Sequence, residues 1–288
     1  MRVLRVGEAG AERPAVLDAS GELLDASGVL DDIDHRSLAD GGLDCLARAV
    51  AGGTLPPLGL PADGVRIGAP VARPGKVVCI GLNYRDHAEE TGAAIPGEPV
   101  VFMKDPWTVS GPYDEVLVPR DSVKTDYEVE LAVVIGRTAR YLDDDADALA
   151  LACVAGYAVS HDVSERAFQL ERGGQWDKGK SCETFNPLGP WLVTPDEVPD
   201  PQKLALRLSV NGVERQHGTT ADMVFPVAEI VRYLSRFMVL HPGDVINTGT
   251  PAGVALGRPE PRPYLRPGDI VECGIDGLGM MRHSFRQA

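Results

Sequence analysis

Basic residues, aromatic residues and long apolar runs are all scarce in this 288-residue sequence. Its 28 lysines and arginines are outnumbered by 42 acidic residues, which gives a net charge of −14. That surplus repels phosphate backbones and anionic bilayers, so neither nucleic acid nor a membrane is an expected partner. No apolar run approaches the ~20 residues of a transmembrane helix. The opening MRVLRVGEAGAERP also lacks the apolar stretch of a secretory signal, and we therefore expect a cytoplasmic protein.

Cysteine is present in an odd number and without close pairs. The five residues are Cys45, Cys79, Cys153, Cys182 and Cys273. A disulfide framework or a cysteine-ligated zinc site shows even counts or tight spacing. The pattern predicts free thiols in a reducing compartment.

The first seventy residues differ in texture from the remainder. MRVLRVGE and RPAVLDAS resemble short strands, and a helix is expected around Ser37–Ala51. Residues 52–75 then carry five prolines among glycines, which is typical of a linker. We predict a small N-terminal domain over residues 1–72 and a main domain over residues 73–288.

The main domain has more predicted strands than helices. Strand patterns occur in KVVCIGLN, PVVFMK, DEVLVP, YEVELAVVIG and VAGYAVSHD, and LALRLSVNGVERQ has the Asn-Gly signal of a hairpin. Helices are expected in YRDHAEETG, in SERAFQLER from Ser164, and in PVAEIVRYLSRFM. Strands and helices rarely alternate, which excludes a doubly wound parallel sheet and predicts a strand-rich α+β fold.

Three carboxylates form the first candidate site. Glu128 and Glu130 lie two residues apart in a strand pattern, so they share one face. Asp162 ends another apolar strand pattern. Three carboxylates at strand ends suit a hard divalent cation. The structural alternatives are a solvated strand edge for the glutamates and a helix N-cap for Asp162.

A second candidate group follows the first strand of the main domain. His87 and Glu90 are three residues apart in a predicted helix and share a face. A histidine oriented by a carboxylate makes a general base near neutral pH. The alternative is an exposed polar helix.

Two basic residues complete the candidates. Lys180 is one of only six lysines and lies in the loop QWDKGKSCETF. It is suited to hold an anionic intermediate, or else is a solvated loop lysine. Arg166, four residues after Asp162, either binds a substrate carboxylate or pairs with a neighbouring acid.

Five ordered segments resemble the fumarylacetoacetate hydrolase family: GLNYRDHAEE, YEVELAVVIG, GYAVSHDVSERAFQ, GKSCETFNPLGPWLV and INTGTPAGV. The resemblance extends from about Lys76 to the C-terminus, and the N-terminal seventy residues resemble the small domain that precedes the catalytic domain in many members. Among these enzymes the chain is similar to bacterial 2,4-diketo-3-deoxy-sugar-acid hydrolases, acylpyruvate hydrolases and oxaloacetate decarboxylases. The resemblance implies a mixed β-roll and a homodimer.

The resemblance also implies roles for individual residues. Mg²⁺ or Mn²⁺ would be held by Glu128, Glu130 and Asp162. The catalytic residues would be His87, Glu90 and Lys180. The substrate contacts would be Thr250, Arg166 and Gln175.

The implied reaction is hydrolysis of a carbon–carbon bond in a 2,4-diketo acid, either an acylpyruvate or a 2,4-diketo-3-deoxy sugar acid, to release pyruvate or a related 2-oxo acid. The histidine would activate water, and the lysine would stabilise the departing enolate. Oxaloacetate decarboxylation and 2-hydroxy-diene-dioate isomerisation are the alternatives on the same scaffold, since fold alone does not settle the reaction. A non-catalytic, metal-stabilised binding protein is the alternative from another class.

Overall fold

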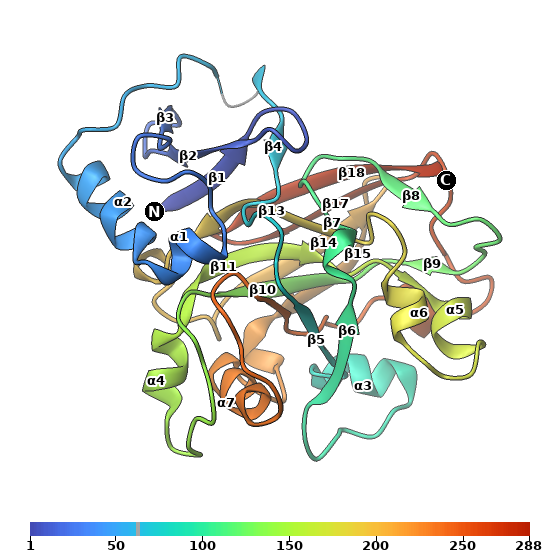
Figure 1. The fold of residues 1–288 in the computed structure, drawn as a ribbon. Helices are drawn as coiled ribbons and strands as arrows, with labels where there is room; N and C mark the ends of the chain where they lie inside the picture. Colours follow the sequence, from blue (N-terminus) through green and yellow to red (C-terminus); the bar gives the residue numbers. More distant parts are fainter. Residues whose placement is uncertain (62–63) are drawn as a thin grey trace.

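A mixed eleven-stranded sheet forms the centre of the computed structural model, which describes residues 1–61 and 64–288 (Figure 1). Its main path runs in the order β3 (Leu23–Asp25), β2 (Arg13–Leu17), β1 (Arg2–Val6), β13 (Asn186–Val193), β11 (Val154–His161), β10 (Val129–Ile135), β16 (Val245–Asn247), β5 (Val77–Gly81) and β6 (Val100–Lys104). Off this path, β4 (Ile67–Gly68) pairs with β1, and β7 (Val109–Ser110) pairs with β13.

A second, five-stranded sheet packs against this one. Its order is β15 (Val213–Thr219), β14 (Ala205–Val210), β17 (Ile270–Ile275), β18 (Gly279–Gln287) and β8 (Val116–Val118). The short strands β9 (Thr125–Asp126) and β12 (Ser164–Glu165) form a separate pair. The sheets contain both parallel and antiparallel strand pairs, and there are few helices. This arrangement confirms the predicted strand-rich α+β class.

Strand β10 shows why the centre of the large sheet is so apolar. Leu131 and Val133 enter the core between the two sheets, whereas Ala132 and Val134 enter a second core on the opposite face. The second core is closed by the N-terminal segment, including Leu46 of helix α2 (Gly42–Ala51). Because both faces are covered, the strand is apolar at consecutive positions instead of alternating.

The N-terminal segment continues the large sheet. Strand β1 pairs antiparallel with β13, with Arg2 opposite Val193, and Val3 packs in the same core as Val77 of β5. The upper left of Figure 1 shows these strands and helices beside the main sheet. The domain boundary at residue 72 stays a prediction.

Two helix predictions are wrong in their bounds. The helix expected over Ser37–Ala51 is two helices, α1 (His35–Ala39) and α2, because Gly41 between them adopts φ 74° and α1 begins earlier at an Asp34 capping box. The helix expected from Ser164 is α5 (Arg166–Leu170), since Ser164 and Glu165 pair with β9 and Glu165 caps the helix.

Other elements match their sequence patterns. The Asn-Gly pair at 211–212 joins β14 and β15, with φ 51° and 76°. The polar helix after the first main strand is α3 (Arg85–Thr91), and the amphipathic pattern after residue 226 is α7 (Val227–Phe237), which packs on α4 (Asp147–Ala152). Helix α6 (Asp177–Lys180) lies beside α5.

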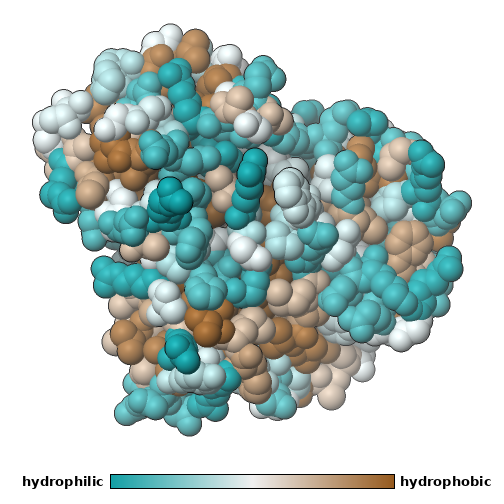
Figure 2. Space-filling model, in the orientation of Figure 1, coloured by the Kyte–Doolittle hydropathy of each residue, from teal (hydrophilic) through white to brown (hydrophobic). Residues whose placement is uncertain are grey.

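The face shown in Figure 2 is largely hydrophilic, with apolar surface in the lower half, where Figure 1 draws β6, α3 and α7, and in smaller patches at the upper left over the N-terminal segment. Val101 of β6 and Phe237 of α7 are among the exposed large hydrophobic residues. Within the described residues, no helix combines the length and apolarity required to cross a bilayer.

Candidate active site

The three predicted carboxylates converge in the structure. Glu128 and Glu130 lie at the start of β10, and Asp162 follows β11, the neighbouring antiparallel strand. One oxygen from each carboxylate lies within 4.8 Å of the others, and all three residues are buried. Asp162 contacts lysine side chains and is not the cap of α5, so the cap reading of this residue is wrong.

Three basic side chains surround the carboxylates. The Lys180 Nζ bridges Glu128 Oε2 at 2.7 Å and Asp162 Oδ2 at 2.8 Å. Lys104 Nζ lies 2.5 Å from Asp162 Oδ1, and Arg166 Nη2 lies 2.5 Å from Glu128 Oε1. Lys180 is only 2% exposed, so it is not the solvated loop lysine considered above.

Glu130 differs from the other two acids because no basic side chain pairs with it in the described structure. Its Oε2 accepts a hydrogen bond from the Gly249 N–H at 2.8 Å. Burial, followed by the charges of Asp162 and Glu128, raises the pKa of Glu130 well above its ordinary value. Burial acts in the same direction on Glu128, but the neighbouring Lys180 and Arg166 charges outweigh it and lower the pKa of that carboxyl.

A divalent cation fits this arrangement. Hard cations prefer carboxylate oxygens, and a positive charge beside Glu130 would relieve its repulsion from Asp162 and Glu128. The donor set has three carboxylates and no thiol or imidazole among the grouped residues. Such a set suits Mg²⁺ or Mn²⁺ better than a soft metal.

Replacing Glu130 by glutamine tests this fit. In the presence of chelator, Glu130→Gln is expected to raise the melting temperature by at least ~2 °C, because a buried repulsive charge is removed while the Gly249 hydrogen bond is kept. At a Mg²⁺ concentration 100 times its Kd, the wild type should gain about 2.7 kcal/mol of stability, and the variant should gain none. Thermal unfolding with and without Mg²⁺ measures both effects.

Glu12 supplies the matched control for Glu130. Its side chain is largely buried and is paired with Arg66 and Arg5. Glu12 is also far from Glu128, Glu130 and Asp162 in the sequence. Glu12→Gln should therefore lower stability and leave the Mg²⁺ effect intact. An unchanged Mg²⁺ effect in Glu130→Gln would contradict the ligand assignment.

Helix α3 places an oriented histidine beside the carboxylates. His87 Nδ1 lies 2.9 Å from Glu90 Oε1, and the two Glu90 oxygens accept from the Gly253 N–H at 3.0 and 2.9 Å. Because Nδ1 faces a carboxylate, it carries the proton and leaves Nε2 as the basic nitrogen. His87 is buried, so the exposed-helix alternative does not hold for it.

A cavity of about 200 Å³ joins these groups. Its lining includes Glu128, Glu130, Lys180 and His87. The remaining lining is rich in apolar and aromatic side chains, among them Ile80, Leu82, Phe102, Leu170, Trp176 and Leu256. Phe102 and Trp176 meet edge to face at 5.4 Å, and the Lys180 ammonium lies 5.0 Å from the Phe102 ring centre. The cavity therefore has a charged floor and an apolar wall.

Comparison with known proteins shows where this chain belongs. Residues 76–286 match the model of the fumarylacetoacetate (FAA) hydrolase C-terminal domain. The chain belongs to the fumarylacetoacetate hydrolase family. A Burkholderia ambifaria relative named as a hydrolase is 53% identical over 289 residues, with both chains fully covered. The chain is an enzyme of this family.

Two solved structures show how the family varies. The maleylpyruvate hydrolase of Sphingobium sp. SYK-6, solved with manganese(II) and pyruvate, is 30% identical with a TM-score of 0.80 and full coverage of both chains. The 2-hydroxyhepta-2,4-diene-1,7-dioate isomerase of Mycobacterium marinum is 32% identical with a TM-score of 0.75, over 100% of this chain and 98% of that one. The fold thus carries both hydrolases and isomerases.

Of the three predicted substrate contacts in this fumarylacetoacetate hydrolase family member, two line the cavity and one does not. Arg166 lines the cavity, but its donors are engaged by Asp126 at 2.8 Å, Glu128 at 2.5 Å and Gln169 at 3.0 Å. It therefore positions Glu128, in agreement with the alternative that Arg166 pairs with a neighbouring acid. Gln175 is exposed, donates to Asp177 and is not part of the cavity lining.

Thr250 lines the cavity with its hydroxyl already engaged. The Oγ1 donates to the Val129 carbonyl at 2.8 Å and accepts from Gln216 Nε2 at 2.7 Å. Within the described structure, no hydrogen bond uses its backbone N–H. The hydroxyl proton is therefore not free to bind a substrate carboxylate.

Two further residues of the site, Lys104 and Asp126, were not predicted from the sequence. Lys104 ends β6 and also donates to the Val163 carbonyl at 3.1 Å, and Asp126 holds Arg166. A lysine at the end of the apolar run VVFMK, in a chain with six lysines, was the available signal for the first. Asp126 directly precedes the glutamate strand, but nothing in its spacing indicates a pairing with Arg166.

A larger cavity, of about 810 Å³, lies against the N-terminal segment. Two of the three arginines in its lining are paired: Arg5 with Asp32 at 2.6 Å, and Arg66 with Asp114 at 2.6 Å. Among the described residues of its lining, no three carboxylates are grouped as Glu128, Glu130 and Asp162 are. The grouped carboxylates make the smaller cavity the candidate active site.

Proposed function

We propose that this enzyme hydrolyses a carbon–carbon bond of an acylpyruvate, releasing pyruvate and a carboxylic acid. The observation that carries the proposal is that Glu128 and Glu130 of the carboxylate group and the oriented His87 line one cavity. A purely structural metal site has no need of the histidine. The manganese and pyruvate bound to the Sphingobium hydrolase support a 2-oxo acid as product.

The metal in this proposal is Mg²⁺ or Mn²⁺, held by Glu128, Glu130 and Asp162. When bound, such a cation polarises the keto and carboxylate oxygens of a 2-oxo acid. The backbone N–H of Thr250, which no hydrogen bond uses within the described structure, would orient the substrate carboxylate. This arrangement directs the remainder of the substrate along the apolar wall.

His87 supplies the proton transfers. Its Nε2 takes a proton from water, and the resulting hydroxide attacks the 4-oxo carbon. The bond between that carbon and C3 then breaks, leaving the acid and the enolate of pyruvate. The protonated His87 returns its proton to C3, so one water is consumed for each bond broken. Glu90 keeps the imidazole in the required tautomer.

Lys180 stabilises the enolate charge. Its ammonium lines the cavity and is fixed by Glu128 and Asp162, so it needs little rearrangement as charge develops. Burial lowers its pKa, but the Asp162 and Glu128 charges outweigh that effect and raise it above the ordinary value. The group therefore remains cationic at neutral pH.

The wall of the cavity favours an apolar acyl group. Phe102, Leu170 and Leu256 offer no hydrogen bonds to a polyol chain. The two cations of the lining, Lys180 and Arg166, are both paired with carboxylates, which leaves no free partner for a second substrate carboxylate. The second carboxylate of a dioate would be desolvated there without a free cationic partner, and a polyol chain would lose hydration against the apolar side chains.

A substrate panel tests this proposal. With Mg²⁺ present, kcat/KM for acylpyruvates with short apolar acyl groups should exceed that for 2,4-diketo-3-deoxy sugar acids and maleylpyruvate by at least ~10-fold, the effect of about 1.4 kcal/mol. Oxaloacetate and a 2-hydroxy-diene-dioate belong in the same panel, since decarboxylation and isomerisation are the alternatives. Turnover of either in preference to every acylpyruvate would contradict hydrolysis as the main reaction.

We also propose that the enzyme is a homodimer, as the family resemblance implies. Sedimentation analysis of the purified protein tests this proposal.

A further inference from the structure

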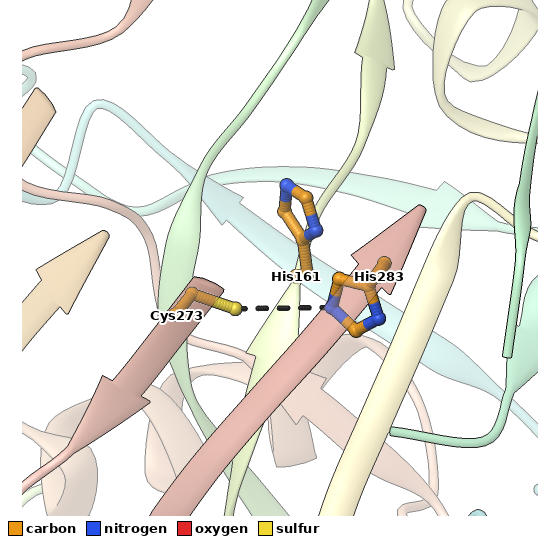
Figure 3. Close-up of side chains that lie close together, drawn as sticks. All are labelled: His161, Cys273 and His283. Carbon is orange, nitrogen blue, oxygen red and sulfur yellow. Dashed lines mark hydrogen bonds between the residues drawn. The ribbon is translucent and has the colours of Figure 1, made fainter. Parts of the chain in front are cut away.

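A second group of potential metal ligands lies in the core between the two sheets. His161 ends β11, Cys273 lies in β17 and His283 lies in β18, and all three are fully buried. Figure 3 shows the three side chains converging from these strands. His161 directly precedes Asp162, and successive side chains along a strand point to opposite faces. The group is therefore separated from the carboxylates by the sheet itself.

The spacing of the three side chains suits coordination of one ion. One ligand atom from each lies within 4.8 Å of the other two, and Cys273 Sγ lies 3.9 Å from His283 Nε2. An ion about 2.0–2.3 Å from nitrogen and sulfur ligands in a trigonal plane would hold them about 3.5–4 Å apart. The two imidazoles stack with centroids 5.2 Å apart and an angle of 23° between planes. Small side-chain shifts bring all three atoms into reach.

The histidines also have unmet polar atoms. Among the described residues, neither ring nitrogen of His161 has a hydrogen-bond partner, nor does Nδ1 of His283. A buried unsatisfied polar group costs about 1–3 kcal/mol. Native structures seldom leave several such atoms side by side unless a water or an ion satisfies them.

We propose that His161, Cys273 and His283 form a closed, three-coordinate site for a soft monovalent cation, Cu⁺. Thiolate and imidazole are the ligands that a soft ion selects. One thiolate and two neutral imidazoles with Cu⁺ give no net charge, which suits an apolar core. Zn²⁺ would leave a buried positive charge and prefers a fourth ligand, which this core does not offer among the described residues.

Binding at this site has a defined proton balance. The Cys273 thiol loses its proton as the sulfur–copper bond forms, and no change in oxidation state occurs. Burial raises the pKa of Cys273, so the thiol stays protonated without the ion. Burial also lowers the pKa of His283 to about 3, so its imidazole is neutral and available as a ligand. Because the site is closed, the ion is expected to enter while the chain folds.

The test uses the full-length protein produced in copper-supplemented cells and purified without oxygen. Cys45 and Cys182 are replaced by alanine, because these are the thiols not buried in the structure. This background should retain one Cu⁺ per chain against the chelator bicinchoninate. X-ray absorption at the copper edge should show one sulfur and two nitrogen neighbours.

Two variants locate the ion. Cys273→Ala and His283→Phe should each weaken Cu⁺ retention by at least about 100-fold, since each removes a direct ligand and even lost outer partners cost 10–100-fold. Cys153→Ala, which removes another buried thiol, and Glu130→Gln, which alters the carboxylate group, should retain Cu⁺ unchanged.

Several outcomes would overturn the site. These are a background protein that releases all its copper to the chelator, a copper spectrum without sulfur, equal retention after Cys273→Ala, or retention of Zn²⁺ in place of Cu⁺. If a variant fails to fold, the absorption spectrum of the background protein still decides. The carboxylate site plays no part in these measurements, so its assignment stands or falls separately.

Discussion

His87→Ala is expected to lower kcat for acylpyruvate hydrolysis by roughly 10²–10⁴-fold, the usual contribution of a general base. The imidazole lines the cavity, and its Nδ1 is held by Glu90 at 2.9 Å, which leaves Nε2 to act on water. In the proposed complex the substrate's 2-oxo acid end is held at the carboxylates, so KM should change far less than kcat. Steady-state kinetics with Mg²⁺ measure both parameters.

Two comparisons make the His87 result specific. Glu90→Gln keeps an acceptor for the Gly253 N–H but removes the charge that orients the ring, so it should show a smaller loss in the same direction. Any oxaloacetate decarboxylation should survive His87→Ala, because loss of CO₂ needs no activated water. His217, an exposed histidine, serves as the control, and His217→Ala should behave as the wild type. Equal hydrolysis by His87→Ala and wild type would rule out the base.

Lys180→Met is expected to give the second large effect, a loss of about 10²–10³-fold in kcat. The substitution keeps most of the stem but removes the ammonium that lines the cavity. Removing it also leaves Glu128 and Asp162 with one cation fewer, which should destabilise the fold by about 3–5 kcal/mol, the usual effect of breaking a buried pair. Oxalate, a planar dianion resembling the enolate, should bind more weakly to the variant.

Lys104 separates catalysis from stability in this experiment. It pairs with the same Asp162 and is equally buried, but it does not line the cavity. Lys104→Met should therefore lose comparable stability while keeping much more of kcat and of the oxalate affinity. If the two lysine variants lost kcat and oxalate affinity equally, Lys180 would have only a structural role.

The sequence predicted best those features that depend on local alternation. Because side chains in a strand alternate, Glu128 and Glu130 had to share a face, and they do so at the cavity. The three-residue spacing of His87 and Glu90 likewise required a contact on a helix, and the structure shows it. The resemblance to a family supplied the expectation that these two local patterns form one site.

Features that depend on distant pairing were not accessible from the sequence. The contacts of Arg166 with Asp126 and of Lys104 with Asp162 join segments 40 and 58 residues apart. No local spacing encodes such contacts. The break between α1 and α2 was not predicted for a different reason. The expected helix ran through Gly41, although an isolated glycine inside a helical pattern can also mark a helix boundary.

Carbon–carbon bond hydrolysis by this enzyme should require a divalent cation at Glu128, Glu130 and Asp162. Pyruvate release from acetylpyruvate, followed after chelator treatment and again after Mg²⁺ is restored, tests it most directly. We expect the wild type to show no release above the uncatalysed rate without the cation and full recovery when the cation is returned. Glu130→Gln should not recover. Full release by the chelator-treated wild type would contradict this requirement.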